Sequence, residues 1–166
     1  MNDTGIIIPT YNARQSIVDS IRKIKKVVPH VRILIVDDNS PDKTAELVTK
    51  TFSKDKTVQV LKRPGKGGRG SAVIAGLKQL YKNKEIKFFI EMDADLCHNP
   101  KYISLLVEKC KKADVIIASR YLPQSRIYGW NLKRKLMSRS INIFAKLMLR
   151  IPISDYTCLL YTSRCV

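Results

Sequence analysis

Short apolar runs rich in β-branched residues alternate along the chain with longer segments of helical periodicity. The runs lie at residues 5–9, 31–36, 57–61, 87–92 and 114–118. Segments with apolar residues at helical spacing lie between them, at residues 14–28, 42–52, 70–83 and 100–112. This alternation predicts an α/β fold, a Rossmann-like and mostly parallel sheet with helices on both faces.

Two dipeptides mark predicted helix starts. Ser40 before Pro41, and Asn99 before Pro100, each place a capping side chain ahead of a proline that suits the first helical turn. In parallel sheets of this kind the ligand crevice lies beyond the carboxyl ends of the strands. The residues at those ends are therefore the first candidates for a site.

A sixth segment, residues 131–150, combines helical periodicity with six Lys or Arg residues and no acidic residue. Its apolar positions are Leu132, Leu136, Ile143, Phe144, Leu147 and the adjoining Ile151. A basic amphipathic helix of this kind can lie on an anionic membrane surface. The same pattern also fits a helix that packs on the sheet and leaves its cations in water, and both interpretations remain open.

Composition narrows the class of protein. The chain has 166 residues, of which 45% are hydrophobic, so we expect one folded domain. The net charge of +17 implies an anionic partner: nucleic acid, a phosphate-bearing substrate or an anionic membrane. No apolar run approaches the roughly 20 residues of a membrane span, and no signal peptide is recognisable. The four cysteines lack metal-binding spacing, which favours reduced, cytosolic thiols.

Carboxylates gather at two predicted strand ends. The second strand ends in Asp37 and Asp38, and the fourth runs into an Asp-Ala-Asp segment at 93–95. Parallel strands would bring these charges to one edge, where they cost stability unless a cation compensates them. A hard divalent ion suits such oxygen ligands. The alternative is that they cap helices, although Asp42 and Asn99 are better placed to do so.

The glycine-rich segment GKGGRGSA at residues 65–72 matches the dinucleotide pattern GxGxxG through Gly65, Gly67 and Gly70. A dinucleotide-binding fold places that pattern in its first strand–helix turn, which here reads PTYN without a glycine cluster. Hydride transfer is therefore disfavoured. Basic residues interleaved with glycine also suit a loop that closes over phosphates.

The fifth predicted strand runs into Arg120, whose planar guanidinium can contact a pair of phosphate oxygens. An aromatic turn, Tyr-Gly-Trp at 128–130, follows, and then the basic run 133–135. Without further evidence, these segments fit an ordinary turn and a solvated charge run.

These segments together resemble the polyprenyl-phosphate glycosyltransferases of glycosyltransferase family 2, most closely the dolichyl-phosphate mannosyltransferases. The matching segments, in family order within residues 5–157, are IIIPTYN, ILIVDDNSPDKT, RPGKGGRGSAVIAGL, EMDADLCHNP, IIASRY, YGWNLKRKLMSRSINIFAKLMLR and ISDYT. The resemblance implies a GT-A fold. It also implies an inverting, metal-dependent transfer of a sugar, mannose from GDP-mannose, to a polyprenyl or dolichyl phosphate.

The resemblance also assigns roles to individual residues. The donor-binding residues would be Pro9, Tyr11, Asn12, Val36, Asp38, Asp93, Ala94 and Asp95. Asp93 and Asp95 would hold Mg²⁺ or Mn²⁺ and act in catalysis together with Arg120. The acceptor phosphate would meet Arg120, Arg134 and Ser138. A phosphate monoester has a second pKa of about 6 and needs no general base to act as the nucleophile.

Three departures from the family pattern matter. Ala13 stands where the family has Glu, which removes one expected donor contact. The segment after Thr157 departs from the family, and its CLLYTS matches one reading frame of a transposon end used to prepare sequencing libraries. We therefore expect an incomplete GT-A catalytic domain at 1–157 and a non-native tail at 158–166. The family's later Arg and Lys, which meet the donor phosphates, are absent.

The expected partners are a nucleotide-sugar donor, a polyprenyl phosphate and a membrane surface, with a peripheral location on the cytoplasmic face. Another donor such as UDP-glucose stays open, as does a sugar-hydroxyl acceptor. The latter needs a catalytic carboxylate, which the acid-free stretch from 115 to 154 disfavours. A basic nucleic-acid-binding module is also disfavoured, because carboxylate pairs would repel a phosphate backbone.

Overall fold

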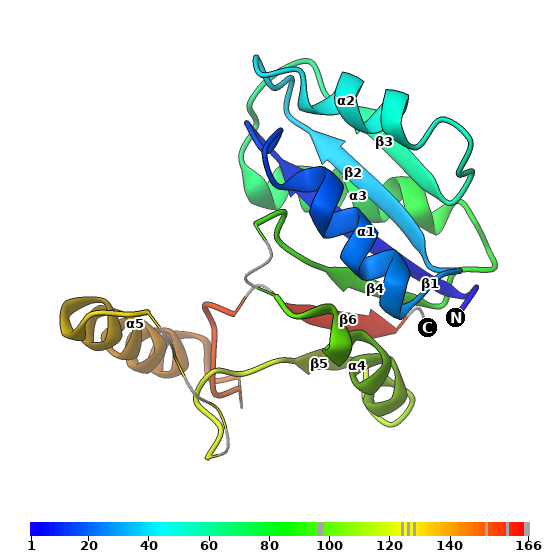
Figure 1. Ribbon diagram of the computed structural model, residues 1–166. Helices are drawn as coiled ribbons and strands as arrows, with labels where there is room; N and C mark the ends of the chain where they lie inside the picture. Colours follow the sequence, from blue (N-terminus) through cyan, green and yellow to red (C-terminus); the bar gives the residue numbers. More distant parts are fainter. Residues whose placement is uncertain are drawn as a thin grey trace. The chain divides into compact units, whose positions relative to one another are not determined.

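Six strands form one mixed sheet in the computed structural model (Figure 1), which describes residues 1–95, 98–123, 125, 127, 129–151, 153–158 and 160–164. The strands are β1 (Thr4–Thr10), β2 (Arg32–Asp37), β3 (Val58–Lys62), β4 (Phe88–Glu91), β5 (Val115–Ile117) and β6 (Tyr161–Arg164). Their spatial order is β3-β2-β1-β4-β6-β5. β1, β2, β3 and β4 pair in parallel, whereas β6 runs antiparallel to β4. The predicted α/β class with a mostly parallel sheet is confirmed.

The helices alternate with the strands as the sequence predicts. They are α1 (Ile17–Val27), α2 (Thr44–Thr51), α3 (Arg69–Tyr81), the short 3₁₀ helix η1 (Pro100–Tyr102), α4 (Ile103–Cys110) and α5 (Leu132–Leu149). The chain divides into two compact units. The sheet unit comprises Met1–Ile116 with Leu160–Val166, and the α5 unit comprises Ile117–Leu159.

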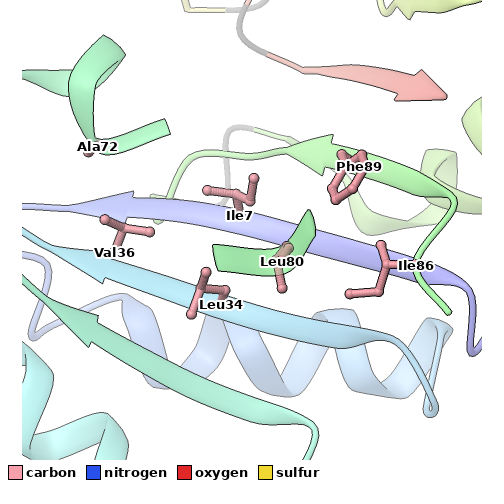
Figure 2. Close-up of a cluster of buried hydrophobic side chains, with 7 residues drawn as sticks. All are labelled: Ile7, Leu34, Val36, Ala72, Leu80, Ile86 and Phe89. Carbon is pink, nitrogen blue, oxygen red and sulfur yellow. The ribbon is translucent and has the colours of Figure 1, made fainter. Parts of the chain in front are cut away.

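The core of the sheet unit lies on both faces of the sheet. One face packs against α3, in a cluster formed by Ile7, Leu34, Val36, Ala72, Leu80, Ile86 and Phe89 (Figure 2). Gly76 lets α3 approach closely, because a Cβ there would lie 2.7 Å from Ile7 Cγ2 and 3.0 Å from Val36 Cγ2.

The opposite face of the sheet is also apolar. Ile6, Ile8 and Ile35 are fully buried, and they alternate along their strands with the residues that face α3. α1 runs in front of β1 and β2 in Figure 1, while α3 lies behind them. The buried isoleucines of α1 are Ile17, Ile21 and Ile24. Helices therefore cover both faces, as predicted.

The predicted cap at Ser40 is wrong. α2 begins at Thr44, and its N-cap position is Lys43, with φ of 61°. Ser40 instead donates to the buried carboxylate of Asp37, from its N–H at 2.9 Å and from its hydroxyl at 2.6 Å. A buried carboxylate needs these donors more than a helix end exposed to water does. The cap at Asn99 is confirmed, since its side chain accepts the N–H of Lys101.

β6 is a strand that the sequence analysis did not predict. It lies in the segment expected to be a non-native tail, yet it pairs with β4 from Phe88 opposite Arg164 to Glu91 opposite Tyr161. Thr162 is fully buried there. The β-branched and aromatic residues of Tyr-Thr-Ser-Arg suit a strand that covers the edge of β4. The non-native origin of the tail stays a prediction.

Asn131 precedes α5 and caps it, because its side chain accepts the N–H of Arg134 at 2.8 Å. Of its residues only Ser138 and Asn142 are buried. The exposed large apolar residues of α5 are Leu132, Leu136, Met137, Ile141, Ile143, Phe144, Leu147, Met148 and Leu149. In the described part of the chain, no helix combines the length and apolarity that a membrane span requires.

Candidate functional site

The carboxyl ends of β1 and β2 are tied together by Asp37. This fully buried side chain accepts hydrogen bonds from the Thr10 hydroxyl at 3.0 Å and from both donors of Ser40. The backbone N–H of Asp38 also donates to the carbonyl of Thr10 at 3.1 Å. The oxygens of Asp37 are thus engaged within the fold, so Asp37 shapes this edge of the sheet.

Asp38 anchors the glycine-rich loop. Its carboxylate accepts a hydrogen bond from Arg63 Nη1 at 2.8 Å and one from the Gly67 N–H at 3.0 Å. Arg63 Nη2 also donates a hydrogen bond to the Ser71 hydroxyl at 2.8 Å. A Cβ at residue 67 would clash with the end of the Arg63 side chain, so a larger residue there would displace the guanidinium from Asp38. The predicted donor-binding residue Asp38 is therefore an ion-pair partner beside the loop.

The other predicted donor residues of β1 and β2 lie at the same edge. Pro9 pairs in register with Val36, but the Val36 side chain is fully buried in the core on the α3 face. Tyr11 is 43% exposed, and the Lys66 ammonium lies 4.3 Å from the centre of its ring. Asn12 has φ of 58°, and its N–H donates to Ser40. Tyr11 is the residue of this group whose flat face an incoming ring can reach.

The end of β4 presents Asp93, Ala94 and Asp95 beside β1. Arg69, the first residue of α3, donates from Nη1 to Asp93 and from Nη2 to Glu91. The carbonyl of Ala94 accepts the hydroxyl of Ser20 from α1 at 2.7 Å. The Asp-Ala-Asp segment is thus positioned by two helices as well as by its strand.

His98 supports the same segment. Its Nδ1 accepts the N–H of Asp93 at 3.1 Å, and its Nε2 lies 3.7 Å from Asp93 Oδ2. Burial lowers the pKa of His98, against the opposing effect of the nearby Asp93 and Asp95 charges. A neutral imidazole fits this geometry, because only an unprotonated Nδ1 can accept the backbone N–H. His98 was not predicted from the sequence as a site residue.

A divalent metal ion fits the donor set at the end of β4. No three His, Cys, Asp or Glu side chains are grouped to hold a metal within the part of the chain that the structure describes. Mg²⁺ is usually bound through one or two carboxylates together with substrate phosphates, and Asp93 with Asp95 supply that number. The four-carboxylate cluster expected from sequence is not formed, since Asp37 and Asp38 are engaged in the contacts above. Cys97 lies outside the described residues.

In the α5 unit, Arg120 is held by Asp155. Its backbone N–H and its Nε donate to Asp155 Oδ2 at 3.0 and 2.8 Å, and its Nη2 donates to Oδ1 at 2.8 Å. Nη2 also reaches the Thr157 hydroxyl at 2.5 Å. Burial alone would raise the pKa of Asp155, but the hydrogen bonds and charge of Arg120 lower it. The hydrogen bond with Asp155 raises the pKa of Arg120.

Trp130 brings the two predicted acceptor arginines together. The guanidinium carbon of Arg120 lies 4.9 Å from a Trp130 ring centre, and that of Arg134 lies 4.3 Å from it. The third predicted residue, Ser138, is buried, and its hydroxyl accepts that of Tyr121 at 2.7 Å. Ser138 is therefore engaged inside the unit. Tyr128, at the start of the predicted aromatic turn, lies outside the described residues.

An open cavity of about 300 Å³ lies beside Arg120. Its lining residues are Arg120, Tyr121, Leu122, Ser125, Ile127, Lys135 and Arg139. Three of these are cationic, so the cavity suits a phosphate. Lys135 and Arg139 were not predicted as site residues, although their spacing of four on a helix places both on one face. Arg134 and Ser138 do not line this cavity.

The chain belongs to a known family of enzymes. Residues 5–164, nearly the whole chain, match the model of "Glycosyl transferase family 2". The fold agrees with that membership. The chain is similar over 97% of its length to glucosyl-3-phosphoglycerate synthase from Mycobacterium tuberculosis solved with Mn²⁺, UDP and glucosyl-3-phosphoglycerate. That match has a TM-score of 0.69 and 15% identity, and it covers 56% of the solved chain.

Two curated relatives are similar in sequence. One is the undecaprenyl-phosphate mannosyltransferase of Micrococcus luteus, 35% identical over 91% of this chain and 62% of its own length. The other is the polyprenol monophosphomannose synthase of Mycolicibacterium smegmatis, 35% identical over 93% of this chain and 58% of its own length. The chain thus spans about three fifths of the length of these relatives.

Proposed function

We propose that this chain is the nucleotide-sugar-binding part of a glycosyltransferase that transfers mannose from GDP-mannose to a polyprenyl phosphate with inversion. The observation that carries the proposal is the Asp-Ala-Asp segment at the end of β4, on the same sheet edge as Tyr11 and Asp38, in a family 2 chain 35% identical to two mannosyltransferases of this kind. In this proposal residues 1–157 form the catalytic domain.

The nucleotide would lie across the ends of β1, β2 and β4. The exposed ring of Tyr11 can stack against the base, while the buried carboxylate of Asp38 would hold the glycine-rich loop beside it through Arg63 and Gly67. Because the Val36 side chain faces the core, this residue would contribute through its backbone, as would Pro9, which pairs with it.

Asp93 and Asp95 would hold Mg²⁺ or Mn²⁺ together with the donor diphosphate. When bound, the ion would neutralise charge that develops on the leaving nucleotide diphosphate. His98 and Ser20 keep the segment in place by the contacts with Asp93 and Ala94 described above. Asp93 would then be presented to the ion without a change in the backbone.

The acceptor phosphate would enter the cationic cavity of the α5 unit. Arg120 is kept charged and oriented by Asp155, while Lys135 and Arg139 line the same cavity. A phosphate that is largely dianionic at neutral pH needs positioning and charge neutralisation and does not need a base. The exposed apolar residues and five cations of α5 suit the surface of an anionic membrane, where a polyprenyl lipid resides.

Calorimetric titration of the full chain with GDP and with UDP, each with and without Mn²⁺, tests the donor assignment. We expect Mn²⁺-dependent binding of GDP that is lost in Asp95→Ala and kept in Asp19→Ala, which removes an exposed carboxylate from α1. If the chain binds UDP in preference to GDP, the donor is a UDP-linked sugar and not GDP-mannose. Binding of neither nucleotide, or binding that ignores both Mn²⁺ and Asp95, would show that the proposed site is wrong.

A further inference from the structure

Arg69 joins the glycine-rich loop to the carboxylates at the end of β4. It is the first residue of α3, and its two terminal nitrogens divide between Asp93 and Glu91. The Glu91 side chain is only 6% exposed, whereas that of Asp93 is 22% exposed. Among the described residues, Arg69 Nε has no hydrogen-bond partner although it is buried. The guanidinium is therefore held by its two terminal nitrogens alone.

This arrangement conflicts with the metal site of the proposed function, on which the inference rests. Asp93 would be a ligand of the divalent ion, yet its Oδ1 already accepts from Arg69. A guanidinium and a divalent cation repel each other strongly at contact distance. The ion can therefore bind Asp93 fully only if the Nη1 branch of Arg69 leaves.

Glu91 gives Arg69 a pivot. Glu91 is buried at the carboxyl end of β4, where the Tyr161 hydroxyl is its other partner, and burial together with that hydrogen bond raises the pKa of Tyr161. A buried carboxylate that lost its cation would carry a large desolvation cost. Arg69 is therefore expected to stay on Glu91 through Nη2, so that only Nη1 changes partner.

The second cation of the loop is placed in a similar way. Lys66 lies over the ring of Tyr11, which the base would contact in the proposed function. The loop between the two cations is fixed at Gly67 by Asp38, and Gly68 has φ of +87°, a conformation that suits glycine. In the proposed function, Lys66 therefore lies where the base would bind, at one end of the donor. Arg69 lies where the metal ion would bind, at the other end.

We propose that Arg69 is an exchangeable counterion of the metal site. Without donor it neutralises Asp93, and when metal and nucleotide bind together its Nη1 branch moves from Asp93 to the diphosphate. The ion then binds weakly by itself and tightly with the nucleotide, because the nucleotide supplies the anion that draws Arg69 away. Such coupling is reciprocal, so the ion must raise nucleotide affinity by the same factor.

The test compares Mn²⁺ binding in full-length wild type, Arg69→Met, Arg69→Lys and Lys78→Met, measured by electron paramagnetic resonance of free Mn²⁺ with and without saturating GDP. Lys78 is exposed on the same helix, so its variant controls for the loss of one positive charge. Without GDP, we expect Arg69→Met to bind Mn²⁺ about tenfold more tightly than wild type, the size of one charged hydrogen bond. Lys78→Met and Arg69→Lys should remain near wild type.

With GDP the order should change. The factor by which GDP raises Mn²⁺ affinity should fall about tenfold or more in Arg69→Met, because the diphosphate then lacks its arginine. If Arg69→Met does not fold, Arg69→Gln gives the same readout, since its amide can still donate to Glu91. A folded variant with wild-type affinity for Mn²⁺ alone would overturn the inference, as would equally tight binding in Arg69→Lys.

The same titration separates this inference from the proposed function. If wild type binds Mn²⁺ with GDP and the Arg69 variants match it in every arm, the counterion role fails and the metal site stands. If wild type binds no Mn²⁺ even with saturating GDP, the proposed function itself fails, and the inference fails with it.

Discussion

The two units of the molecule each contain an arginine–aspartate pair, and the two pairs are built in opposite ways. In the α5 unit the aspartate is the fixed member: Asp155 is 1% exposed and takes three hydrogen bonds from Arg120. In the sheet unit the carboxylate at the strand end, Asp93, takes one such bond, and Arg69 divides its nitrogens between two acids.

The difference indicates which member of each pair is free to meet a ligand. Because Asp155 is buried and fully bonded, it holds Arg120 in place and leaves that arginine to line the cationic cavity. The side chain of Asp93 is 22% exposed, whereas that of Asp155 is fully buried, so a cation from solution can compete with Arg69 for Asp93. An arginine and an aspartate thus form both pairs, but the α5 unit presents a fixed cation to a ligand and the sheet unit presents an exchangeable carboxylate.

The largest expected effect is on stability, from Asp155→Ala. Removing one partner of a buried ion pair typically costs about 3–5 kcal/mol, and the partial exposure of Arg120 places the expected loss near the lower end, at about 3 kcal/mol. Urea unfolding followed by circular dichroism measures it. Asp114→Ala, which breaks an exposed pair with Arg164, is the matched control and should cost about 1 kcal/mol or less. Equal losses in the two variants would refute the contrast between fixed and exposed pairs.

Asp93→Asn should show the reverse pattern. Its amide still accepts a hydrogen bond from Arg69 but binds a divalent ion poorly, so we expect a stability change of about 1 kcal/mol or less. The affinity for GDP in the presence of Mn²⁺ should fall about a hundredfold, because the ion loses a charged ligand. Calorimetry and urea unfolding of the same preparation give both numbers. A folded variant that is destabilised by several kcal/mol but binds Mn²⁺ with GDP as tightly as wild type would mean that Asp93 is a structural residue and not a ligand.

Much of the fold could be predicted from sequence, because apolar runs and helical periodicity are local signals. The five predicted strands and the predicted helices all occur, with bounds that shift by a few residues. The prediction of a cap at Ser40 was wrong because the Ser40 hydroxyl donates to Asp37. Asp37 becomes buried and needs this donor only once β1 and β2 pair. β6 was missed because its four residues carry no strong pattern and their place in the sheet depends on β4.

The site was predictable where it follows strand ends and hidden where it depends on distant pairs. Asp93 and Tyr11 stand out by position, since each follows a predicted strand. Arg69 lies 24 residues before Asp93, and its pairing emerges only once α3 packs on β1 and β2 and brings Arg69 to the end of β4. Arg63 and His98 were not predicted either, because their partners Asp38 and Asp93 are likewise brought to them only by the fold. A cation in a glycine-rich loop facing acidic strand ends is the signal that could have found Arg69.

The pH dependence of stability offers a smaller and more specific test of the fixed pair. The hydrogen bonds from Arg120 lower the folded-state pKa of Asp155 below its ordinary value of 3.8. A depressed pKa means that the pair contributes its full stabilisation above about pH 4 and loses it as the pH falls through the folded-state value. The stability difference between wild type and Asp155→Asn should therefore shrink in urea titrations as the pH falls from about 4 to the lowest pH at which both proteins fold. A difference that stays constant over that range would remove the ion pair as its cause.

The smallest expected effect concerns Trp130, which the fixed arginine shares with Arg134. A cation–π contact at this exposure is worth about 0.5–1 kcal/mol, so Trp130→Leu should raise the KM for polyprenyl phosphate about two- to fivefold with little change in the free energy of unfolding. The Mn²⁺ and GDP affinities of the sheet unit should not change, because Trp130 contacts Arg120 and Arg134, which belong to the proposed acceptor site. Leu122→Ala, which shortens an apolar side chain of the same cavity, separates a loss of cation orientation from a general loss of cavity shape. If Trp130→Leu instead lowers Mn²⁺ affinity, the division of labour between the two arginine–aspartate pairs does not hold.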